Sequence, residues 1–89
     1  MWRYRARVRL HASAEAMAGR LPPAVGLEAV DERTCLLDTG ADSLHMLVVY
    51  LGMLDVDFDV MEPPELVDHV RTLADRYRRA TPAAGAGQG

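Results

Sequence analysis

The first residues alternate strictly between apolar and arginine side chains. The alternation places Trp2, Tyr4, Ala6, Val8 and Leu10 on one side and Arg3, Arg5, Arg7 and Arg9 on the other. A period of two residues is typical of a β-strand with one buried face and one face in solvent. The chain must therefore fold around a sheet that buries one side of this strand.

The residues that follow predict a short helix and then a hairpin. Ser13 is suited to cap a helix that carries Ala14, Met17, Ala18 and Leu21 on its apolar side, and Pro22-Pro23 ends it. We expect strands over residues 27–30 and 34–39 on either side of a turn at 31–33, with Gly40 ending the second strand.

Three further elements are expected in the second half. Asp42 or Ser43 caps a helix that runs to about Leu54, and alternation over residues 56–61 predicts a fourth strand. Pro63-Pro64 opens a last helix. The apolar face of that helix consists of Leu66, Val70, Leu73, Ala74 and Tyr77.

This order of elements predicts an α+β domain. Two βαβ-type halves joined by a hairpin correspond to the ferredoxin-like βαββαβ fold, an antiparallel sheet with helices on one face, here followed by a C-terminal helix. We expect residues 1–79 to form this domain and residues 80–89, which are rich in Gly and Ala, to form a disordered tail.

Composition excludes several classes of protein. The 89 residues carry a net charge of −3, which does not suit a generic nucleic-acid binder. The one cysteine, Cys35, cannot form an internal disulfide and is expected in the core. No apolar run is long enough for a signal peptide or a membrane span, so we expect a cytoplasmic protein.

Three blocks resemble the C-terminal extension (WCX) domain of WYL-domain transcriptional regulators. They are the segment Arg5–Leu10 followed by Ser13-Ala14-Glu15, the segment Thr39–Leu44 leading into Leu51-Gly52, and the segment Glu62–Val67 running to Ala74–Tyr77. The resemblance implies a sensing, regulatory or dimer-forming module. Full-length members also carry a helix-turn-helix and a WYL domain, which this sequence lacks, so DNA contact would be only indirect.

The row Arg3, Arg5, Arg7 and Arg9 is the first candidate site. Planar guanidinium groups at regular spacing suit phosphates or carboxylates of a nucleic acid or an acidic effector. The ferredoxin-like arrangement places Asp38, Asp57 and Asp59 on the same open face. We expect these acids to neutralise the row largely, although a mixed outcome would leave Arg3 and Arg9 free.

The middle helix is the second candidate site. Its core side is expected to be Leu44, Leu47, Val48, Leu51 and Leu54, yet the other side is also apolar. A helix that is apolar all round is buried on both sides, which so small a domain cannot achieve alone. We therefore predict an interface formed by His45, Met46, Val49, Tyr50 and Met53. The alternative is that the first or third helix covers part of this side.

The other residues offer little chemistry. His11, His45 and His69 lack metal-ligand spacing, and His69 is expected at the surface. A helix start at Gly40–Ser43 suits an anion but is more often a cap. We expect no cofactor, no metal and no enzymatic activity, since no acid/base pair or nucleophile motif is present.

The sequence thus predicts a regulatory module of a WYL-type regulator that acts by protein–protein contact and through effector binding on its sheet. The expected partner is a second copy or a WYL domain. The alternative is a stand-alone, ACT-like dimeric sensor that binds a small molecule, and a small ferredoxin-like enzyme is the least favoured hypothesis.

Overall fold

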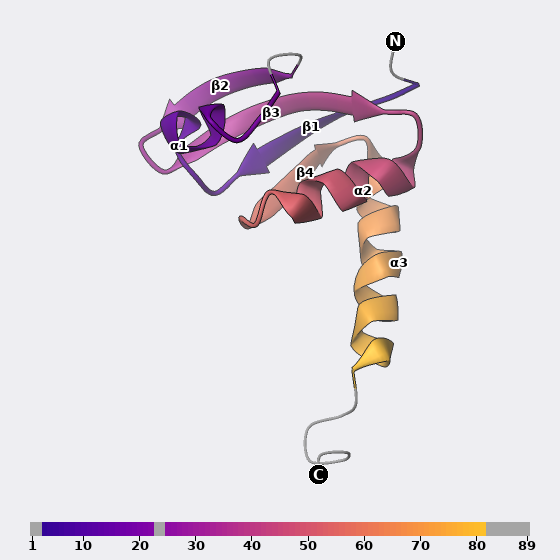
Figure 1. Cartoon of the computed structure of the whole chain (residues 1–89). Coiled ribbons are helices and arrows are strands. Elements are labelled where there is room, and N and C mark those ends of the chain that lie inside the picture. Colours follow the sequence, from indigo (N-terminus) through magenta and orange to yellow (C-terminus); the bar gives the residue numbers. More distant parts are fainter. Residues whose placement is uncertain (1–2, 23–24, 82–89) are drawn as a thin grey trace.

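The alternating segment forms strand β1 (Tyr4–Leu10), as expected. The computed structural model describes residues 3–22 and 25–81, so the expected inward position of Trp2 lies outside the described residues. The later elements are α1 (Ala14–Ala18), β2 (Gly26–Asp31), β3 (Thr34–Ala41), α2 (Leu44–Met53), β4 (Phe58–Glu62) and α3 (Pro64–Ala80) (Figure 1).

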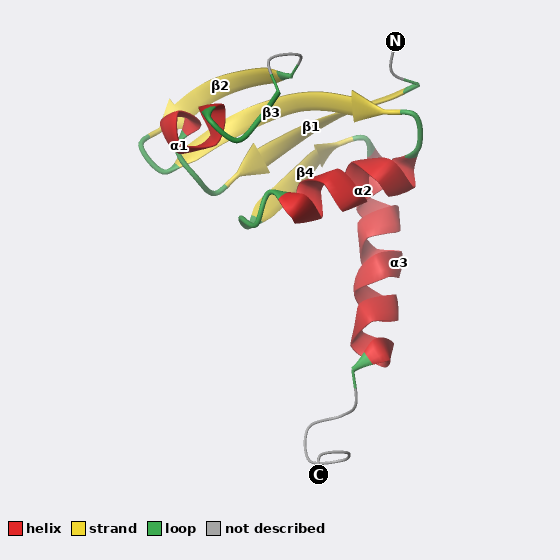
Figure 2. Cartoon of the chain, in the orientation of Figure 1, coloured by secondary structure: helices red, strands yellow, loops and turns green. Residues whose placement is uncertain are grey.

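The strands form one four-stranded sheet in the order β2-β3-β1-β4. β1 pairs antiparallel with both β3 and β4, and β2 pairs antiparallel with β3. The predicted α+β class, the antiparallel sheet and the central place of β1 are therefore confirmed (Figure 2).

Local sequence signals place several ends of these elements. The Ser13 and Ser43 side chains each accept a hydrogen bond from the backbone N–H three residues later, at 3.1 Å, and so cap α1 and α2. At the other end of α2, the guanidinium of Arg20 donates to the carbonyl oxygen of Leu54. Pro64 occupies the first turn of α3, where its missing N–H costs nothing.

Other boundaries differ from the expectations. α1 stops at Ala18, before the prolines, and β3 continues through Gly40 to Ala41 because β1 extends its ladder as far as the Tyr4–Ala41 pair. The fourth strand begins at Phe58 rather than at residue 56. α3 includes Ala80, and the rest of the predicted tail, from residue 82, lies outside the described residues.

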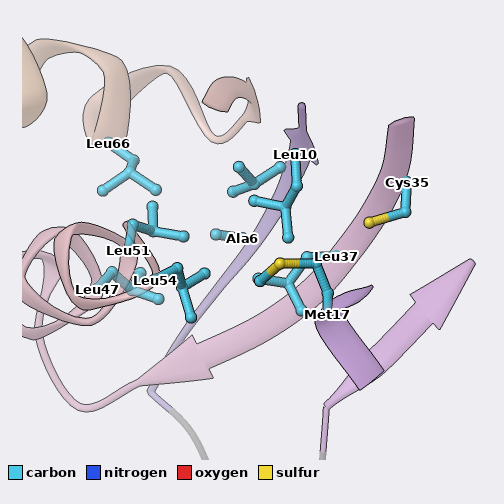
Figure 3. Close-up of a cluster of buried hydrophobic side chains, with 10 residues drawn as sticks. Ala6, Leu10, Met17, Cys35, Leu37, Leu47, Leu51, Leu54 and Leu66 are labelled. Atoms are coloured by element: carbon cyan, nitrogen blue, oxygen red, sulfur yellow. The ribbon is translucent and has the colours of Figure 1, made fainter. Parts of the chain in front are cut away.

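A single apolar core lies between one face of the sheet and the helices. Val8, Leu10, Cys35 and Leu37 of the sheet are fully buried there, as predicted for the inward face. α1 contributes Met17, α2 contributes Leu47 and Leu51, the turn after α2 contributes Leu54, and α3 contributes Leu66 (Figure 3). The side chains of α1 and α2 thus meet the same face of β1 and β3.

α3 differs from the other helices because only its first half belongs to this core. Leu66 and Leu73 are buried, whereas every residue from Ala74 to Ala80 is exposed. In Figure 1 the helix runs steeply past α2 and its C-terminal half projects away from the sheet. Even this helix is too short and too polar to cross a membrane, and the same holds for the other helices of the described ranges.

Candidate functional site

Arg5, Arg7 and Arg9 of β1 point away from the core, on the open face of the sheet, and Arg3 lies exposed just before the strand. Their neighbours in β1, namely Ala6, Val8 and Leu10, are buried against the helices. Arg7 lies opposite Asp38 of β3 and Glu62 of β4, and Arg9 lies opposite Asp59. The register skips Met61, so that Glu62 rather than Met61 faces Arg7.

Among the described arginines of this row, only Arg7 forms ion pairs. Its guanidinium lies 3.8 Å from a carboxylate oxygen of Glu28 and 4.0 Å from one of Asp38. Both pairs are solvent-exposed and long, so each contributes at most about 1 kcal/mol. Within residues 3–22 and 25–81, no carboxylate comes within 4.0 Å of the guanidinium groups of Arg3, Arg5 or Arg9.

The other two predicted neutralising acids, Asp57 and Asp59, do not pair with the arginines of the described residues. Asp59 accepts from Nε2 of His11 at 2.7 Å, and the backbone carbonyl of Asp57 accepts from the N–H of His11 at 2.9 Å. The expected neutralisation by Asp38, Asp57 and Asp59 is therefore wrong for Asp57 and Asp59. The reason is that His11, directly after β1, occupies the position beside the start of β4.

A shallow hollow lies in the middle of this face. Its volume is about 290 Å³, and it is lined by Arg5, Ala6, Arg7, Asp38 and Glu62. The two carboxylates in the hollow oppose the binding of a polyanion, because they repel phosphates beside the arginines that would attract them. This arrangement suits a small zwitterionic molecule better than the phosphate backbone of a nucleic acid.

The outward side of α2 exposes large apolar side chains. Leu47 and Leu51 are fully buried, whereas Met46 is 54% exposed, Val49 38% and Met53 74%. His45 is exposed as well. The structure therefore places four of the five predicted interface residues at the surface, and their role in an interface stays a prediction.

Tyr50 is the exception among the predicted interface residues. It packs against the core cluster, and its hydroxyl is buried without a hydrogen-bond partner in the described part of the chain. Burial raises the pKa of this phenol above its ordinary value. The correction follows from helix geometry, because Tyr50 is three residues from both Leu47 and Met53 and lies at the edge of the buried stripe.

α3 covers one flank of α2. The rings of His45 and His69 meet edge to face, with centroids 5.7 Å apart and planes at 82°. Nε2 of His69 is buried and has no partner among the described residues, so the prediction of a surface position for His69 is wrong. The alternative in which the third helix covers part of α2 thus holds at this flank.

An apolar groove opens between α2 and α3, beside the start of β4. It has a volume of about 340 Å³. Its lining consists of Val48, Val49, Gly52, Met53, Phe58, Val70, Leu73, Ala74 and Tyr77. We call this feature the α2–α3 groove.

Sequence reasoning missed the contribution of α3 to this surface. Tyr77 was assigned to the core side of its helix, yet 60% of its surface is exposed. The apolar stripe itself was visible in the sequence, but its exposure follows from the direction in which α3 leaves the body, and no local pattern specifies that direction.

Comparison with known families supports the resemblance drawn from the sequence. The model of the WCX domain matches residues 2–78, which confirms that resemblance. No solved structure matches the chain.

Proposed function

The chain belongs to the WCX domain family, and from this premise we propose that it is a regulatory module that acts by protein–protein contact. The family implies a role in WYL-type transcriptional regulators in general. The proposed partners are a second copy of the chain or a WYL domain, and the proposed site of action is the cytoplasm.

One observation supports contact as the mode of action. The α2–α3 groove brings Val49, Met53 and Tyr77 to the surface around an apolar hollow. Contiguous exposed apolar surface on a small domain marks a place where another molecule binds. Methionine and tyrosine are also enriched at such contacts.

We also propose that the domain is of the ferredoxin-like type. Its strands and helices follow one another as βαββαβ with α3 added at the end, and β1 lies between β3 and β4. Both features support this assignment.

Effector binding on the sheet is a second candidate function. The hollow around Arg5 and Arg7 offers two cations beside Asp38 and Glu62. A zwitterionic small molecule fits this set of charges. Titration calorimetry with amino acids would test it, and Arg5→Gln should abolish any heat of binding.

The test of the main proposal compares variants in the source cells. Val49→Asp with Met53→Asp places two charges on the groove, and Ala16→Asp adds a charge at an exposed position of α1 as a control. We expect the double variant to alter transcript levels as deletion of the gene does, and Ala16→Asp to leave them unchanged. Unaltered transcripts on deletion would contradict the proposal.

A further inference from the structure

The two walls of the α2–α3 groove carry opposite charges at their margins. α2 itself has no acidic or basic residue besides His45, but exposed acids flank it: Asp42 before the helix, and Asp55 and Asp57 after it. Asp57 directly precedes Phe58, which lines the groove. The α2 wall is therefore an apolar surface with an acidic margin.

The projecting end of α3 has the reverse character. Arg76, Arg78 and Arg79 are exposed around the apolar stripe that ends at Tyr77. Arg78 pairs with Asp75 of the same helix at 2.6 Å, and no carboxylate of the described residues lies within 4.0 Å of Arg76 or Arg79. The end of α3 is thus apolar with a basic margin.

These surfaces complement each other but do not meet in one chain. No ion pair joins Asp42, Asp55 or Asp57 to an arginine within residues 3–22 and 25–81. Because each chain carries both the acidic α2 surface and the basic α3 end, two copies of the chain can pair the α2 surface of each with the α3 end of the other. In a two-fold dimer each contact then occurs twice.

We propose that the α2–α3 groove receives the end of α3 from a second copy of this chain. The partner's Tyr77 packs against Val49 and Met53, and the partner's arginines approach Asp55 and Asp57. This inference rests on the proposed function and names the occupant of that surface.

The charges also favour docking of α3 on the partner's α2 over direct pairing of the two α3 ends. Antiparallel pairing of two α3 ends alone would bring Arg76, Arg78 and Arg79 of both chains together, with Asp75 as the only acid of each projecting half. Like charges in contact are destabilising. Docking of α3 on the partner's α2 avoids this repulsion and pairs unlike charges.

The required area is modest. A typical stable interface buries about 800 Å² per partner, roughly an eighth of the 6093 Å² surface of this chain. Because the two-fold axis repeats the contact, each chain buries both its groove and its α3 end, and each of these two surfaces need supply only half of the area per partner. The exposed side chains of Val49, Met53 and Tyr77 supply the apolar centre of the contact.

Sedimentation equilibrium of the full chain tests the proposal. We expect a dimer for the unaltered chain and for Ala16→Asp. Tyr77→Asp should weaken dimerisation at least about tenfold, because it places a charge in the apolar centre of the contact. Circular dichroism verifies that each variant is folded, and an unaltered chain that is monomeric at about 100 μM would overturn the proposal.

Charge reversal identifies the occupant. Asp57→Arg with Asp55→Asn, and separately Arg76→Glu with Arg79→Glu, should each weaken the dimer about tenfold or more. A mixture of the two variants should recover association, because both contacts of the mixed dimer pair unlike charges, one in the native and one in the reversed sense. Failure of the mixture to recover would refute the pairing, and so would a dimer that all these variants leave intact.

The same variants separate this inference from the proposed function. If the chain is monomeric in solution but deletion of its gene still alters transcript levels, the proposed regulatory function stands and the proposed dimer is refuted. A monomeric chain that binds a purified WYL domain through the groove assigns the groove to that partner instead, and so overturns the inference.

Discussion

The hydroxyl of Tyr50 is a buried polar atom with no partner in the described part of the chain. Such a group carries the full cost of its desolvation, about 1–3 kcal/mol. We expect Tyr50→Phe to raise the free energy of unfolding by about 1 kcal/mol, measured by urea denaturation. The control is Tyr77→Phe at an exposed position, which should change nothing, and a loss of stability in Tyr50→Phe would show that the hydroxyl has a partner.

The same phenol gives stability a dependence on pH in alkali. Burial raises the pKa of Tyr50 in the folded state above the ordinary value of 10.0. The folded chain therefore retains its proton where the unfolded chain has lost it, so stability falls as the pH rises above about 10. We expect the difference in stability between Tyr50→Phe and the unaltered chain to widen above that pH, as urea titrations at a series of pH values would show.

Asp55 adopts the left-handed backbone conformation, with φ at +58°, in the turn between α2 and β4. Aspartate tolerates this conformation better than most residues, glycine adopts it freely, and a β-branched residue does not. We expect Asp55→Gly to retain or slightly raise the melting temperature and Asp55→Val to lower stability by about 1–2 kcal/mol. Equal stability of the two variants would contradict this explanation of the turn.

At the scale of elements, β1 shows what the sequence could predict. Its alternation predicted both the buried face and the arginine face, because a strand in the middle of a sheet cannot rotate without moving apolar side chains into water. The charge partners could not be predicted in the same way. The skipped Met61 and the proximity of His11 to Asp59 depend on how β4 aligns with β1, and no local pattern specifies that register.

The two faces of β1 should respond differently to substitution. Val8→Ala removes buried methyl groups from a fully enclosed site and should cost about 2 kcal/mol. Arg7→Gln breaks only exposed ion pairs at 3.8 and 4.0 Å and should cost less than about 1 kcal/mol. Urea denaturation of both variants measures the difference, and an equal loss in Arg7→Gln would mean that the open face contributes more to stability than its geometry implies.

The helices show the limit of periodicity as a guide. α2 is apolar on every side, so the pattern indicated excess apolar surface but not which flank α3 would cover. As a result the pattern grouped Tyr50 with the exposed residues although it is partly buried against the core, while Met46, Val49 and Met53 are exposed as expected. The sequence predicted the apolar stripe of α3 as far as Tyr77. Whether the end of that stripe is exposed depends on the direction in which the helix leaves β4, which is a tertiary property.

At the scale of the whole molecule, the chain divides into a packed body and a projecting end. The body contains the sheet, α1, α2 and the first half of α3, and it buries one continuous apolar core. The end of α3, from Ala74 to Ala80, is exposed along its length. A helical segment of about two turns with few tertiary contacts is only marginally stable in water. The end of α3 should therefore unfold locally far more often than the body does.

Limited digestion with trypsin should reveal this division, because arginines occur in both parts of the molecule. We expect cleavage after Arg76, Arg78 and Arg79 well before cleavage after Arg5, Arg7 and Arg9, since β1 is hydrogen-bonded on both edges and opens only when the sheet does. Mass spectrometry of early fragments measures the order. Cleavage of α3 should slow as protein concentration rises if a second copy covers its end, and Tyr77→Asp should remove that dependence. Early cleavage within β1 would show that the sheet is less stable than its buried core implies.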